Sequence, residues 1–152
     1  MYGKLKAGGS VNLPDGRTIE GHMLVGPPRK GRKIALSGDT LPIPIVEEMA
    51  QQADLLIHEA TYLHSEREHA LRGYHSTAEA AAKTALQAQV KQLVLNHFSA
   101  RYETAIQLQA LLNEARAIFP ETILATDFLI VEVLRGEAAA RDKTNSCLTS
   151  KS

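Results

Sequence analysis

The sequence lacks the features that mark secreted, disulfide-stabilised or membrane-spanning proteins. It has a single cysteine, Cys147, so no disulfide can form within the chain. It has no run of about 18 apolar residues, the length that a transmembrane helix needs, and its first residues show no apolar signal-peptide segment. We therefore expect a soluble protein with no membrane partner, and the scarcity of cysteine agrees with a cytoplasmic location.

The chain also lacks an excess of charge of either sign. Its 17 lysine and arginine residues match its 17 aspartate and glutamate residues, so no overall basic field indicates nucleic acid binding. Several basic residues nevertheless precede residue 34, namely Lys4, Lys6, Arg29, Lys30, Arg32 and Lys33. This group is either a solvated loop or an edge that contacts phosphates.

Length and composition predict one globular domain, since the chain has 152 residues and is 44% hydrophobic. Residues 1–32 are rich in glycine and proline, and we expect a loop-rich entry with two short strands around a turn at residues 14–16 (Pro-Asp-Gly). Strands and helices alternate over residues 33–135. Residues 136–152 show no apolar period and are expected to form a disordered tail.

The alternation of apolar runs and amphipathic segments predicts an α/β fold with one mixed sheet and covering helices. The predicted strands are residues 33–36, 55–57, 92–95, 122–124 and 128–131, and the predicted helices are residues 42–53, 77–89 and 103–118. Ser76 and Glu79 have the spacing of a capping box at the start of the second helix. Five strands and three helices are few for a sheet covered on both faces, so we expect the chain to be part of something larger.

Four polar clusters each stand at the end of an apolar run. They are residues 37–40 (Ser-Gly-Asp-Thr), 58–61 (His-Glu-Ala-Thr), 75–77 (His-Ser-Thr) and 96–102 (Asn-His-Phe-Ser-Ala-Arg-Tyr). Ligands of open α/β sheets bind outside the carboxyl ends of the strands. Strands that end in Asp, in His-Glu and in His therefore predict a functional site along one edge of the sheet.

Each of these residues, taken by itself, allows two interpretations. Asp39 could bind a cation or cap the following helix, and His97 could be a zinc ligand or a hydrogen-bonded core histidine. His75 stands near the positive end of a helix, where it could contact phosphate or donate a proton, or be an ordinary loop residue. His58 and Glu59 could form a carboxylate–imidazole pair behind a site, or a surface ion pair.

Together, in this order and spacing, the four clusters resemble ribonuclease Z. That family consists of zinc-dependent endonucleases that trim the 3′ end of precursor tRNA, and it belongs to the metallo-β-lactamase superfamily. The resemblance runs from Tyr2 to about Val133. It implies the C-terminal half of a metallo-β-lactamase-like αββα sandwich, with precursor tRNA as the substrate. A superfamily hydrolase of small esters is disfavoured, because the clusters at 58–61 and 75–77 are those of the ribonuclease branch.

The resemblance also implies roles for individual residues. Asp39 and His97 are implied to bind metal, in a site that holds two zinc ions in the complete enzyme. His75 is implied to donate a proton to the leaving oxygen, and Glu59, with its neighbour His58, is implied to assist it. Substrate contacts are expected from Arg101, which could bind a phosphate, and from two hydroxyl side chains, those of Ser76 and Thr77.

The chain departs from the family pattern in its metal motifs. The family's main metal motif, His-x-His-x-Asp-His, is absent, and residues 2–6 resemble only the end of the arm that grips tRNA. We therefore expect a C-terminal half that is inactive in isolation and pairs with a second copy or with an N-terminal half. The alternative is a non-catalytic fragment or subunit, which binds tRNA or completes a split enzyme with a separate N-terminal chain.

Overall fold

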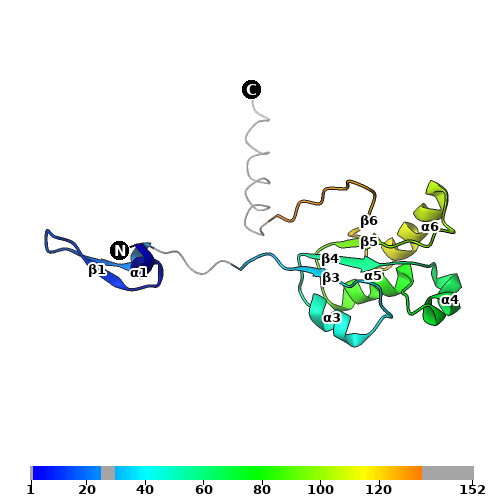
Figure 1. Ribbon diagram of the computed structural model, residues 1–152, viewed down its shortest axis with the longest axis horizontal. Helices are drawn as coiled ribbons and strands as arrows, with labels where there is room; N and C mark the ends of the chain where they lie inside the picture. Colours follow the sequence, from blue (N-terminus) through cyan, green and yellow to red (C-terminus); the bar gives the residue numbers. More distant parts are fainter. Residues whose placement is uncertain (1, 25–29, 135–152) are drawn as a thin grey trace, which may run out of the picture. The chain divides into compact units, whose positions relative to one another are not determined.

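The chain forms two structural units. The computed structural model describes residues 2–24 and 30–134 (Figure 1). Contacts group the chain into Met1–Gly31 and Arg32–Ser152. The tail predicted for residues 136–152 lies outside the described residues. Among the helices that the structure describes, none combines the length and the hydrophobicity needed to cross a bilayer.

The first unit contains the two short strands that we expected around the turn, and also two short helices that we did not predict. Its elements are α1 (Tyr2–Lys6), β1 (Ser10–Asn12), β2 (Thr18–Glu20) and α2 (Gly21–Leu24). The strands flank the predicted turn and pair antiparallel, with Val11 opposite Ile19. At Gly21 a Cβ atom would lie 2.3 Å from the carbonyl oxygen of Leu5, so only glycine lets the start of α2 approach α1 this closely.

The second unit is built on a four-stranded sheet with the order β3-β4-β5-β6. The strands are β3 (Ile34–Leu36), β4 (Leu55–Glu59), β5 (Leu93–Asn96) and β6 (Thr122–Leu124). All three pairings are parallel, so the mixed sheet that we predicted is corrected to a parallel one for the described residues. Parallel neighbours need crossover connections, and here each connection contains a helix. These helices are α3 (Pro44–Ala50), α5 (Ala78–Gln87) and α6 (Ala105–Arg116).

The strand predicted at residues 128–131 is wrong. Phe128 has a φ of 64°, which is outside the extended region, and Leu129 N donates to Thr126 O at 3.0 Å to close a turn. Phe128 and Ile130 are 99% and 90% exposed. Aliphatic and aromatic residues gave this segment the composition of a strand, but it pairs with none of the described strands.

One face of the sheet carries the hydrophobic core. Strand side chains alternate between faces, and Ala35, Leu56 and Leu93 project to the face that the helices cover. Figure 1 shows α5 lying along the sheet, with α3 beside it. The buried face of α5 consists of small residues, namely Ala78, Ala81, Ala82, Thr84 and Ala85. Small side chains let the helix approach the sheet closely.

The opposite face of the sheet is only partly covered. Ile34 and Leu36 on the edge strand β3 are 58% and 59% exposed, whereas Leu55 and Val94 on the central strands are each 4% exposed. Two large aliphatic side chains therefore lie open on β3. The expectation that the sheet is too sparsely covered for two buried faces therefore holds at the edge strand β3, but not at the central strands of the described residues.

The first residues of α5 are capped differently from the prediction. Thr77 rather than Ser76 is the N-cap of α5, because Thr77 Oγ1 accepts a hydrogen bond from Ala80 N at 3.2 Å. A capping box is present instead at α6, where Thr104 and Gln107 bond reciprocally. Two short helical segments between β4 and α5 were not predicted, the 3₁₀ turn η1 (His64–Glu66) and α4 (Arg67–Arg72).

The close contact between α5 and the sheet predicts that α5 will not tolerate larger residues. Ala82 is fully buried, so Ala82→Leu should lower the free energy of unfolding by about 1–3 kcal/mol through overpacking. Urea denaturation measures this change. The control is Ala105→Leu at the exposed start of α6, which should stay within about 0.5 kcal/mol of wild type. Equal effects of the two substitutions would contradict the close packing.

Candidate metal centre and active site

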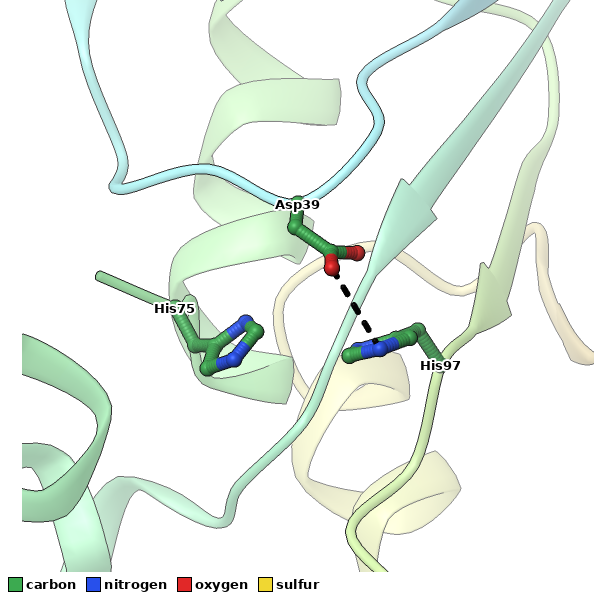
Figure 2. Close-up of side chains that lie close together, drawn as sticks. All are labelled: Asp39, His75 and His97. Carbon is green, nitrogen blue, oxygen red and sulfur yellow. Dashed lines mark ion pairs between the residues drawn. The ribbon is translucent and has the colours of Figure 1, made fainter. Parts of the chain in front are cut away.

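Three predicted site residues converge at the carboxyl edge of the sheet. Asp39 lies in the loop after β3, His75 in the loop before α5, and His97 directly after β5. One ligand atom from each can be chosen such that all three atoms lie within 4.8 Å of one another. His97 Nε2 is 3.4 Å from Asp39 Oδ2, and the two imidazole rings have centroids 5.1 Å apart (Figure 2). The strand-end clusters therefore form one site.

Unusual backbone conformations direct two of these side chains. Gly38 has a φ of +62°, which glycine adopts readily and which turns the chain immediately before Asp39. His97 has a φ of +54°, in the left-handed region that residues other than glycine seldom occupy. Such strain persists where the surroundings enforce it, and it is concentrated at functional sites. The backbone at His97 therefore supports the assignment of this residue to the site.

A buried carboxylate, Glu59, lies behind the cluster at the end of β4. Only 1% of this residue is exposed. Glu59 Oε1 accepts from His75 Nδ1 at 3.0 Å and from Thr40 N at 2.9 Å. Glu59 Oε2 accepts from Thr61 N at 3.2 Å and from Thr61 Oγ1 at 2.6 Å. Two carboxylate oxygens offer about four acceptor positions, and these four donors fill them.

Ser76 and Thr77, which we predicted to bind substrate, have structural partners. Ser76 is 1% exposed, and its hydroxyl donates to Thr40 O at 2.7 Å. Thr77 is 5% exposed, and its hydroxyl caps α5. Both hydroxyls are therefore withdrawn from solvent. The Ser76 hydroxyl fixes the loop that carries His75 against the loop that carries Asp39, and the Thr77 hydroxyl fixes the start of α5.

The structure does not bring His58 into the site. Neighbouring strand residues point to opposite faces, so His58 projects into the helix-covered core while Glu59 faces the site. His58 is fully buried, its Nδ1 donates to Glu59 O at 2.7 Å, and its Nε2 has no hydrogen-bond partner among the described residues. Burial lowers the pKa of His58, because the core disfavours the charged imidazolium. We correct the predicted catalytic role of His58 to that of a core residue.

Arg101 lies near the site but is held by other side chains. Its Nη1 is 2.5 Å from Glu66 Oε1, and its guanidinium lies 5.1 Å from the centre of the Tyr62 ring. The Tyr102 hydroxyl donates to Glu66 and accepts from Leu63 N at 2.9 Å. Burial, reinforced by the Glu66 carboxylate, raises the pKa of Tyr102 to about 12. These contacts tie the segment after β4 to the segment after β5, and phosphate binding by Arg101 stays a prediction.

Sequence reasoning missed two residues that organise the site. Thr61 contacts both Glu59 and His97, the latter through its hydroxyl at 2.9 Å from His97 Nδ1. Glu114 on α6 accepts from His64 N at 2.9 Å and from Glu79 N at 3.1 Å, so it joins η1 to α5. Burial raises the pKa of Glu114. Only the position of Thr61 inside the His-Glu-Ala-Thr cluster could have drawn attention to it, and no sequence signal marks Glu114.

A small pocket of about 190 Å³ adjoins the metal-binding candidates on the side of His75. Pro42, Ala70, Leu71 and Ala80 supply an apolar lining. Charged side chains of Arg67, Glu79 and Lys83 border it. The pocket is smaller than the roughly 300–1,000 Å³ of sites for drug-sized ligands. It has room for one planar ring or a group of similar size.

The three converging side chains fit a transition-metal site. A carboxylate and two imidazoles are oxygen and nitrogen ligands of the kind that zinc takes. Asp39 and His97 are partly exposed, with 57% and 46% of their side chains accessible, so a metal and a substrate could both reach them. Three ligands from one chain are too few to complete two tetrahedral metal ions. These three side chains therefore fit zinc as part of a site that needs further ligands.

Comparisons with known proteins identify relatives of this chain. No family model matches the sequence. A ribonuclease Z from Bacillus licheniformis is 52% identical over 135 residues, and one from Crocosphaera subtropica is 50% identical over 137 residues. Each alignment covers 89% of the chain. The chain is a homologue of ribonuclease Z. It spans 44% of the length of each of these two relatives.

Solved structures agree with this relationship. The short form of human tRNase Z matches with a TM-score of 0.52 and 31% identity, over 77% of this chain and 37% of that one. A long-form RNase Z from yeast matches with a TM-score of 0.55 and 29% identity, over 76% and 15% of the two chains. A metallo-β-lactamase-fold protein from Bacillus subtilis, 20% identical with a TM-score of 0.59, supports the fold alone. The predicted ribonuclease Z resemblance and α/β metallo-β-lactamase-type fold are confirmed.

The buried His58 predicts a specific loss of stability in acid. Its ordinary pKa is 6.5 and its folded pKa is lower, so below about pH 6.5 the unfolded chain binds a proton that the folded chain excludes. Relative to His58→Leu, the wild-type free energy of unfolding should fall by at most about 1.4 kcal/mol per pH unit as pH drops below 6.5. Above that pH the difference should be constant.

Denaturant titrations at several pH values measure this dependence. His22→Leu is the control, since His22 is exposed in the first unit and should leave the pH profile unchanged. A His58→Leu variant whose pH profile parallels that of wild type would show that His58 is not excluded from protonation.

Proposed function

We propose that this chain supplies part of the active site of a zinc-dependent endonuclease that removes the 3′ trailer from precursor tRNA. The reaction is hydrolysis of a phosphodiester that leaves a 3′-hydroxyl on the tRNA. The observation that carries the proposal is the convergence of Asp39, His75 and His97 in front of the buried Glu59, in a chain homologous to ribonuclease Z.

Asp39 and His97 are the residues that we propose to hold zinc. Bound zinc would activate a water molecule and neutralise the charge that develops on the phosphate. The two histidines differ in what faces Nδ1, which is the neutral hydroxyl of Thr61 at His97 and the carboxylate of Glu59 at His75. A neutral imidazole is the form that binds metal, whereas a carboxylate stabilises an imidazolium. This contrast supports ligation by His97 and proton donation by His75.

In this proposal His75 holds a proton on Nε2 and transfers it to the leaving oxygen of the phosphodiester. Glu59 keeps the ring oriented and balances its charge throughout, because its carboxylate is fixed by three donor groups besides His75. The pocket beside His75 offers a place for the base of one nucleotide next to the scissile phosphate. Its apolar lining suits the face of a base, and Arg67 at its border suits a phosphate.

We propose that the chain is active only when another polypeptide completes the ligand set. The exposed Ile34 and Leu36 on β3 give such a partner an apolar surface, whether it is an N-terminal half or a second copy of the chain. The alternative is that the chain is not an enzyme but a non-catalytic subunit that binds tRNA. We place the protein in the cytoplasm on its low cysteine content.

The isolated chain should show no measurable cleavage of precursor tRNA, even with added zinc, because its ligand set is incomplete. Adding the remaining part of the Bacillus licheniformis relative as a separate polypeptide should restore trimming, measured by gel analysis of a 3′-labelled precursor. A mixture that contains the Asp39→Asn chain should stay inactive. Robust trimming by the pure chain alone would contradict the proposal, and so would an active Asp39→Asn mixture.

The chain should still bind one divalent metal weakly through its own ligands. His97→Asn removes an imidazole while keeping a residue that tolerates positive φ, so it should reduce zinc affinity at least tenfold without unfolding the site. Competition with a chelating dye measures the affinity. His22→Asn, an exposed histidine of the first unit, is the matched control and should bind zinc as the wild type does. Unchanged affinity in His97→Asn would exclude His97 as a ligand.

A further inference from the structure

We propose that Thr61 is a positioning residue that sets the tautomer of His97, and that it does so because Glu59 takes the hydroxyl hydrogen of Thr61. The inference deepens the proposed function and rests on it for the consequence at the metal. The hydrogen-bond assignment itself concerns only residues of this chain. Thr61 is 4% exposed, so water does not compete for its hydroxyl.

The conclusion that Thr61 donates to Glu59 follows from counting the hydrogens available to the contacts around the Thr61 hydroxyl. Thr61 Oγ1 has one hydrogen and three acceptor atoms within reach, Glu59 Oε2 at 2.6 Å, His97 Nδ1 at 2.9 Å and His97 O at 3.0 Å. Glu59 has four donors around it and no acceptor, the environment of an ionised carboxylate that can only accept. The shortest contact is therefore the bond in which Thr61 donates.

His97 Nδ1 must then be the donor in its contact with Thr61. With its hydrogen engaged by Glu59, the hydroxyl oxygen has lone pairs left, and Nδ1–H donates to one of them. The other ring nitrogen, Nε2, consequently carries the lone pair. Nε2 faces Asp39 Oδ2 at 3.4 Å, so two lone-pair atoms point into the same space, as the ligands of one cation do (Figure 2).

Glu59 thus orients both imidazoles of the site, His75 directly and His97 through Thr61. On this assignment, Nδ1 carries a hydrogen in each ring, and each of these nitrogens is within hydrogen-bond distance of its partner. Removing the Thr61 hydroxyl would leave His97 Nδ1 without a partner among the described residues. The ring could then place its hydrogen on Nε2 and donate to Asp39, which would block ligation by both residues.

The test uses the metal-free chain with ¹⁵N-labelled histidine, studied by long-range ¹H–¹⁵N NMR at about pH 8, above the ordinary imidazole pKa of about 6.5. The spectra report which ring nitrogen carries hydrogen, and His97→Asn assigns the His97 signals. Wild type and Thr61→Ser, which keeps a hydroxyl, should show hydrogen on Nδ1 of His97. Thr61→Val, of the same shape without a hydroxyl, should shift His97 toward the Nε2–H tautomer.

Two results would overturn the inference: an Nε2–H tautomer in the wild type, or an unchanged Nδ1–H tautomer in a folded Thr61→Val chain. The wild-type spectrum decides the first point even if Thr61→Val fails to fold, and backbone amide spectra report folding. His22 in the first unit is an internal control, whose signals should be the same in every variant.

Zinc affinity separates this inference from the proposed function. Thr61→Val should bind zinc about 10–100-fold more weakly than wild type, the usual effect of losing a partner behind a metal ligand, and Thr61→Ser should bind as wild type does. A wild-type chain that binds no zinc overturns the proposed metal centre and leaves the tautomer to be decided by the spectra. A tautomer shift with unchanged zinc affinity overturns the claim that Thr61 positions His97 for metal.

Discussion

The site depends on one buried carboxylate. Glu59 is withdrawn from solvent at the end of β4, where an ionised group is costly unless its acceptor positions are filled. The groups that fill them come from the loop after β3, from the segment after β4 and from the loop before α5, through Thr40, Thr61 and His75. Satisfying this one charge therefore brings three separate parts of the sequence to fixed positions. Loss of one donor leaves the carboxylate partly unsatisfied, and this couples the loops to one another.

The fold supports this arrangement by bringing strand ends together on one side. A parallel sheet has all its carboxyl ends at the same edge, and the alanine face of α5 keeps the helix close enough to the sheet for the His75 loop to reach Glu59. The other side of the molecule is less complete, since large side chains of β3 are exposed. The chain, which spans 44% of the length of the Bacillus licheniformis relative, thus contains the buried carboxylate that supports the candidate site, and it exposes large apolar side chains on its edge strand.

Sequence reasoning located the four sheet strands, the crossover helices and the converging Asp39, His75 and His97, because apolar runs and strand-end polar clusters are local signals. It failed where the decisive information is three-dimensional. The apolar run at 128–131 looked like a strand, but a turn with a positive φ at Phe128 prevents extension. His58 and Glu59 were treated as a pair, although alternation along a strand sends neighbours to opposite faces. The role of Thr61 depends on one hydroxyl hydrogen, which no sequence pattern specifies.

The left-handed backbone at His97 has a consequence for the range of sequences that this fold can use. Two independent requirements, here called filters, limit which residues can occupy position 97. The left-handed backbone conformation excludes β-branched residues, and the proposed chemistry requires a nitrogen or oxygen ligand. Asparagine and glycine satisfy the first filter but supply a weaker ligand or none. In a saturation library, therefore, most substitutions at this residue would either fold without binding metal or do neither. Aspartate is the exception, because it tolerates the left-handed region and supplies a carboxylate ligand.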